Sequence, residues 1–148
     1  MSSISQEISD AVVALLNDHT FNPPFTAARM LAPAVELSEI SDLKVFVIPF
    51  GRKCKRETRG EIWTEDHTIQ IARIKRFGKA TFETAAQPYI DLGELISDYL
   101  APLPIAGVGN ARLIDIDEKL PYDAPLAIKN DQLFALLNLT YRLARKLG

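Results

Sequence analysis

The chain contains few of the residues that most often build reactive or metal-binding sites. Among its 148 residues there are one cysteine, Cys54, and two histidines, His19 and His67. A single cysteine cannot form a disulfide within the chain, and such sparing use fits a reducing compartment. Neither histidine has a cysteine or a second histidine at the spacing of a zinc site. We therefore expect no internal disulfide, no metal ion and no cofactor.

Signals for membrane association and for common enzyme classes are also missing from the sequence. No apolar run approaches the ~20 residues that a membrane-spanning helix needs, and the first residues lack the basic and apolar segments of a signal peptide. The segment Gly107-Val108-Gly109 lacks the third glycine and the lysine of a phosphate-binding loop. A serine nucleophile motif is absent too. We expect a soluble protein made in the cytoplasm, with no membrane partner and no catalytic residues.

What remains is an ordinary globular composition, with 47% apolar and 24% charged residues. The length predicts a single domain spanning residues 1–148, with a core of its own. The net charge of −2 argues against a protein that binds nucleic acid with its whole surface, although it allows a local basic patch.

Residues 43–77 hold the most distinctive pattern. A strand-like apolar run, Leu43–Phe50, leads into a charged segment, Gly51–Gly60, and a second strand-like run follows at His67–Lys75. Two such runs around a polar insert predict a hairpin with a long charged arm. A charged loop that packs against nothing usually exists to contact a partner; the alternative is a solvated, mobile loop. The candidate interaction residues are Arg52, Lys53, Lys55, Arg56 and Arg59, with Trp63 at the base of the arm as either an anchor or a contact residue.

The two runs of this hairpin differ in their alternation of apolar residues. In the first run both sets of alternating positions are largely apolar, which indicates a strand that is covered on both sides or lies at a subunit contact. In the second run, Ile69 and Ile71 share one face, after which the apolar phase shifts to Ala72 and Ile74. This shift predicts a β-bulge near Ala72.

Two segments have the apolar spacing of amphipathic helices. The first covers residues 4–18, where Ser3 and Gln6 have the spacing of a capping box. The second covers residues 81–100, where Pro88 either kinks the helix or marks a later start.

Further strands are expected on both sides of the second helix. Residues 25–32 and 112–120 have strand-like alternation, and in the latter Ile114 and Ile116 are expected to face inward. Residues 132–147 suit either a helix or a strand with one strongly apolar face. Together the elements predict an α+β fold, with an antiparallel or mixed sheet of about four strands and two helices packed on one face.

Asp115 and Asp117 form the clearest carboxylate pair in the sequence. Their spacing puts both on one side of a strand, where they could hold a divalent ion or form an acidic interaction face. A solvated strand face is the commoner situation for such a pair. We expect no metal there.

Several segments, taken in order, resemble one family. They are Phe25–Arg29, Asp42–Pro49, Arg56–Arg59, Asp66–Ile71 and Leu139–Arg142. Their order and spacing are similar to those of the tail-terminator-like minor tail proteins of long-tailed bacteriophages and prophages, over most of the chain. Arg73 and the acidic stretch Asp115–Glu118 depart from that pattern. The resemblance favours a strand for residues 25–32 and for residues 132–147.

The resemblance implies a structural protein of the virion tail, made in the cytoplasm of the bacterial host. Such proteins cap the tail tube as a ring, commonly of six subunits, and present a surface for joining the head. The implied partners are other copies of the chain, the tail tube protein, a head-completion or connector protein, and DNA passing through the ring. The alternatives are a nucleic-acid-binding module that uses the basic arm, another neck or head-completion protein, and a small hydrolase or nuclease that uses Asp115 and Asp117.

Overall fold

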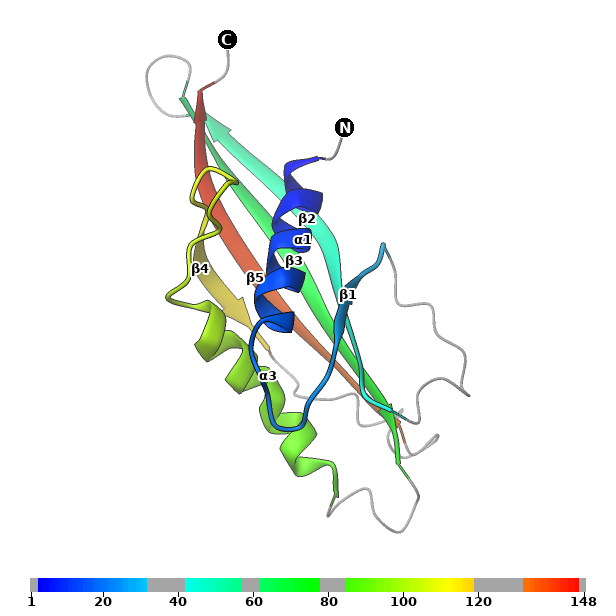
Figure 1. Ribbon diagram of the computed structural model, residues 1–148. Coiled ribbons are helices and arrows are strands. Elements are labelled where there is room, and N and C mark those ends of the chain that lie inside the picture. The colour runs from blue at the N-terminus through cyan, green and yellow to red at the C-terminus, as the bar shows by residue number, and fades with distance from the viewer. Residues whose placement is uncertain (1–2, 32–41, 57–61, 78–84, 119–131, 147–148) are drawn as a thin grey trace.

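Over the residues that the structure describes, the fold combines two helices with an open, mixed sheet of five strands (Figure 1). The computed structural model describes residues 3–31, 42–56, 62–77, 85–118 and 132–146. In chain order the elements are α1 (Ile4–Asn17), β1 (Ala27–Arg29), β2 (Lys44–Arg56), β3 (Ile62–Arg76), α3 (Gln87–Leu100), β4 (Arg112–Asp117) and β5 (Gln132–Lys146). The strand order is β1-β2-β3-β5-β4. The β1–β2 pair is parallel and every other pair is antiparallel, so the predicted α+β class is confirmed.

Both helices pack on the same face of the sheet (Figure 1). Each contributes one buried stripe at helical spacing to a single core cluster, and the central strands contribute alternate residues. The helix residues are Ile8, Val12, Leu16, Leu92, Ile96 and Leu100, and the strand residues include Val45, Val47, Ile69, Ile71, Leu137 and Leu139.

A second, smaller apolar cluster lies on the opposite face of the sheet. It consists of Phe46, Ile48, Ala72 and Ile74, all of them buried. The first half of β2 is therefore buried on both sides, as its uninterrupted apolar sequence predicted.

The helix predictions hold where the structure describes them. Ser3 and Gln6 form the expected capping box at the start of α1. In the described part of the second helix, α3 begins at Gln87 and Pro88 occupies its first turn; residues 81–84 lie outside the described residues. The C-terminal segment, which suited either structure, is the long strand β5.

The charged segment after Phe50 is not a loop as far as the structure describes it. Residues 51–56 continue β2 and stay paired with β3. The predicted bulge near Ala72 is wrong, since the pairing is regular there and the register shift falls between Pro49 and Gly51. Residues 57–61, which include Arg59, lie outside the described residues.

The expected burial of Ile114 and Ile116 in β4 is also wrong. Ile114 and Ile116 are each 45% exposed, whereas Leu113 packs against the main core. After the register shift between Leu113 and Asp115, Ile116 lies opposite Leu139, on the helix-bearing face, but it stays exposed on this six-residue edge strand.

Arg73 is the most unusual residue of the core. Its side chain is 0% exposed and its guanidinium pairs with the carboxylate of Glu118. Nη1 also donates to the backbone oxygens of Tyr89 and Ile90 in the first turn of α3, each at 3.1 Å. Burial lowers the pKa of Arg73 and raises the pKa of Glu118, so the attraction between the two charges opposes a large desolvation cost.

Gly93 provides the space for this ion pair. A methyl group at this position would meet both terminal nitrogens of Arg73 at 2.8 Å and would also collide with the Glu118 carboxylate. The glycine thus reflects a close approach between α3 and the sheet, not a weak point of the helix.

Gly93→Ala is expected to destabilise the fold by about 1 to 3 kcal/mol, although alanine is by about 1 kcal/mol the better helix former. The reason is that the ion pair must shift to admit the methyl group. The measurement is urea unfolding, and Gly51→Ala is the matched control because nothing lies within 4 Å of its added methyl group. Equal stability of the two variants would contradict the proposed role of Gly93.

No helix among the described residues is long and apolar enough to span a bilayer.

Candidate functional site

The outer half of β2 carries most of the interaction residues predicted from the sequence. All seven residues from Phe50 to Arg56 are exposed. β1 pairs with β2 only at residues 45–47, so no described strand pairs with this edge of β2 beyond Val47. At this end, β2 and β3 reach past the N-terminus of α1 (Figure 1).

The predicted cations do not form one patch, because they alternate between the two faces of the sheet. Arg52 and Arg56 lie opposite His67 and Trp63 on β3, on the face that carries the helices. Lys53 and Lys55 project from the other face.

The helix-bearing face holds a polar cluster, which we call the Glu65 cluster: the buried Glu65 and His67 with the more exposed Arg52 and Arg145. Glu65 and His67 are fully buried on β3. Arg52 Nε donates to Glu65 Oε1 at 2.8 Å, and Arg145 Nε lies 3.1 Å from Glu65 Oε2. His67 Nε2 lies 3.3 Å from Glu65 Oε1, and its Nδ1 is hydrogen-bonded to Ser5 Oγ in α1 at 2.6 Å.

Charge and burial act in opposite directions on this cluster. Burial raises the pKa of Glu65, but the hydrogen bond and charge of Arg52 and the charge of Arg145 outweigh it, and the net pKa lies below the ordinary value. Burial lowers the pKa of His67 more than Glu65 raises it. The cluster therefore holds a charged carboxylate beside a neutral imidazole at neutral pH.

Ser5, His67 and Glu65 are connected in the order hydroxyl, imidazole, carboxylate, as in a hydrolase triad. However, the imidazole is completely buried and the carboxylate is held by two arginines. These residues line neither of the two clefts described below. The arrangement is suited to fixing the outer end of the hairpin against α1, because His67 is bonded to Ser5 in α1 and Glu65 to Arg52 in β2.

Trp63 lies further out on β3 and is half-buried. It is opposite Arg56 on β2 and Arg145 on β5. It is therefore the second residue of β3, among the cations of the helix-bearing face.

The other face of the outer sheet is polar. Arg142 donates to both carboxylate oxygens of Asp66, at 2.7 and 3.0 Å. A Thr68–Thr140 hydroxyl contact and a Gln70–Asn138 amide contact follow along the same face. On the neighbouring strand β4, Asp115 lies opposite Thr140 and Asp117 lies opposite Asn138, so both carboxylates are on this polar face. Among the described residues, no group of three or more metal-binding side chains gathers.

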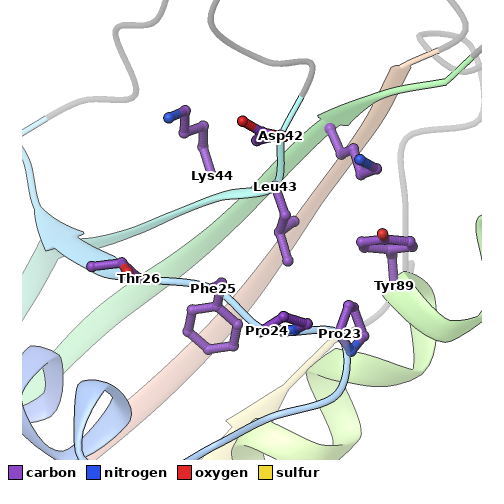
Figure 2. Close-up of a pocket in the computed structure, with 9 residues that line it drawn as sticks. Pro23, Pro24, Phe25, Thr26, Asp42, Leu43, Lys44 and Tyr89 are labelled. Carbon is purple, nitrogen blue, oxygen red and sulfur yellow. The ribbon is translucent and has the colours of Figure 1, made fainter.

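Two clefts lie away from these residues. The larger, of about 510 Å³, lies between the segment before β1, the start of β2 and the start of α3 (Figure 2). In it, Lys75 Nζ lies 5.2 Å from the Tyr89 ring centre, a cation–π distance. The smaller cleft, of about 370 Å³, is lined by residues 101–104 with Arg112 and Leu113. No sequence pattern had indicated either cleft.

The burial of the ionisable residues Glu65, His67 and Arg73 was not predicted from the sequence. The alternation of charged with apolar residues along residues 62–76 is the only signal that could have shown which face they occupy. Neither a protein-family model nor a curated protein matches the sequence of this chain.

Proposed function

We propose that this protein is a structural assembly protein of a phage or prophage tail, which caps the tail tube as a ring and presents the surface for head joining. The observation that carries the proposal is the outer half of β2. It offers seven consecutive exposed residues and an edge that no described strand occupies. The similarity of the sequence segments to tail-terminator-like proteins is the reason for proposing that this edge contacts other proteins of a phage tail.

A long open strand edge is costly for a folded protein. An open strand edge presents unpaired backbone donors and acceptors, and proteins usually shorten or cover it. Here β2 extends instead to 13 residues and β3 to 15, longer than the strands of most globular domains. A ring needs a surface on each subunit that binds a different surface of the next, and a strand edge supplies one.

The partners proposed on this basis are other copies of the chain, the tail tube protein and a head-completion or connector protein. The ring of six is carried over from the resemblance. The test is electron microscopy of the purified protein and of tail tube protein polymerised in its presence. Rings and a halt in tube growth are expected; tubes that lengthen unchanged, with no rings, would refute the proposal.

A second candidate, a nucleic-acid-binding module, is favoured by the exposed cations Lys53, Lys55 and Arg56. It predicts DNA binding that weakens steeply with salt, because each phosphate contact releases counterions. If the assembled ring also binds DNA, the DNA that passes through it would be one of its partners.

Lys53→Ser with Lys55→Ser is expected to preserve folding and to weaken ring formation by about tenfold. These two side chains are exposed on the outer half of β2, so their loss removes charge from the contact and not from the core. Arg52 is left in place because it pairs with the buried Glu65. The measurement is sedimentation velocity, with thermal unfolding as the check on folding.

The matched control is Lys44→Ser with Arg76→Ser, which removes the same charge from the other end of the β2–β3 pair. It should assemble like the unaltered protein. Equal loss of assembly in both variants would show that net charge matters and that the outer end does not.

A further inference from the structure

The sheet has two edges that are open over the described residues, and they lie on opposite sides of the molecule. One is β2 from Ile48 to Arg56, beyond the short β1. The other is β4, which pairs only with β5. An open edge on each side is the geometry from which a sheet can continue from one copy into the next.

The two edges lie at nearly the same height across the sheet. Following the register from β4 through β5 and β3 to β2, Asp117 aligns with Ile48. By the same path, Arg112 aligns with Lys53. The whole of β4 is therefore level with the open part of β2, and copies standing side by side in one orientation bring the two edges together.

The strand directions also fit. β2 is antiparallel to β3, β3 to β5 and β5 to β4, so β2 and β4 run in opposite directions. Two copies in the same orientation would thus pair β4 of one with β2 of the next in the antiparallel sense. A ring of this kind needs no rearrangement of either strand.

The charges of the two edges are complementary. Lys53 and Lys55 on β2 and Asp115 and Asp117 on β4 all project from the face opposite the helices. An antiparallel contact would therefore place opposite charges on one face, where cross-strand pairs stabilise a sheet. Arg112 is the one cation on β4 and lies level with Lys53. The contact therefore brings both carboxylates to the two lysines when β4 is shifted along β2 toward Arg56.

Apolar side chains accompany the charges on both edges. Phe50 on β2 is 60% exposed, and Ile114 and Ile116 on β4 are each 45% exposed. Covering apolar surface of this kind by a neighbouring subunit stabilises the contact by about 25 cal/mol for each Å² buried. They add a hydrophobic component to the contact between the two edges.

We propose that copies of this chain bind head to tail, with β4 of one copy added antiparallel to the outer half of β2 of the next, so that the sheet continues between subunits. This inference deepens the proposed function and rests on it for the closure of the ring. The bulges near Phe50 and Ile114 and the charges beside them also fit edges that are protected against pairing. The experiment therefore has to separate attraction from protection.

Charge reversal on each edge separately provides that test. One variant carries Lys53→Glu and Lys55→Glu, and the other carries Asp115→Lys and Asp117→Lys. Each alone has like charges on both edges, so its self-association should fall at least about tenfold. An equimolar mixture should regain association, because each acidic edge then meets a basic edge of the other variant. Sedimentation velocity gives the size, and native mass spectrometry should show alternating copies.

A second measurement uses the unaltered chain and does not depend on how the variants fold. Amide hydrogen exchange is compared at low and high protein concentration. Protection should rise together in residues 48–56 and in β4 as copies associate. Circular dichroism and thermal unfolding check that both charge-reversed variants keep the fold.

Four results would overturn the inference: an unaltered chain that stays monomeric at its highest soluble concentration, single variants that associate normally, a mixture that stays dissociated, or protection that arises at other surfaces. Failure of the proposed function is distinguishable from these. Rings that cap tail tubes but ignore the edge variants would refute only the edge contact. Edge-dependent association without any effect on tail tubes would refute only the tail function.

Discussion

Glu118→Ala is expected to lower the free energy of unfolding by about 3 to 5 kcal/mol, one of the largest effects available to a single substitution in this chain. The reason is the guanidinium that it leaves behind. Arg73 is 0% exposed and lies against the first turn of α3, where it keeps only backbone oxygens as partners. An unpaired charge in such a place bears its full desolvation cost. Urea unfolding at neutral pH measures the change.

The double replacement Arg73→Met with Glu118→Leu separates the cost of an orphaned charge from the net value of the pair. It should destabilise the fold much less than Glu118→Ala, because apolar residues of similar size remove both desolvation costs at once. Asp10→Ala is the control, since it breaks the exposed Arg29–Asp10 pair and should cost no more than about 1 kcal/mol. Equal losses from Glu118→Ala and Asp10→Ala would show that Arg73 reaches water.

The sequence predicted this fold best where apolar spacing and capping agree. The stripe of α1 and its capping box lie as expected, because burial of that stripe and satisfaction of the first backbone donors both favour the same residues. The apolar character of β2 on both faces likewise predicted its burial on both sides. In each case local preference and tertiary packing point to the same structure.

The sequence failed where pairing across the sheet overrides local pattern. Residues 51–56 are polar on both faces and lack strand alternation, so only their hydrogen bonding to β3 makes them a strand. The bulge in β4 puts Leu113 and Ile116 on the same face, which strict alternation does not allow, and a bulge leaves no clear sign in sequence.

The candidate site shows the same division. The cations were recognised because they cluster in the sequence. Their distribution over the two faces of the sheet depends on the register with β3. The burial of Glu65 and His67 depends on contacts with Arg52, Arg145 and Ser5, which lie far from them along the chain. No local pattern contains those contacts.

Acid is expected to destabilise the protein in two steps, both of which arise in the Glu65 cluster. The pKa of His67 is lowered from 6.5 in the folded state. As the pH falls through 6.5, the unfolded chain therefore takes up a proton first and is favoured. The pKa of Glu65 is lowered from 4.5, so a second loss begins as the pH falls through that value and continues down to the folded pKa. Each unit of difference between the folded and unfolded pKa corresponds to about 1.4 kcal/mol.

Substitutions at the two positions should affect the two steps differently. His67→Gln should remove the first step, so that stability no longer falls between pH 6.5 and pH 4.5. Glu65→Gln should cost about 2 kcal/mol at neutral pH, because Arg52 loses a charged acceptor. It should also remove the second step and extend the first, since the Glu65 charge is what holds the pKa of His67 up against burial.

Urea unfolding at a series of pH values gives both profiles, and His19→Gln removes the other histidine of the chain as the control. If His67→Gln kept the full loss of stability below pH 6.5, His67 would have to be accessible to water in the folded protein. The outer end of the hairpin would then not be fixed to α1 through Ser5, and the edge of β2 would lack the rigid support that a repeating contact between subunits requires.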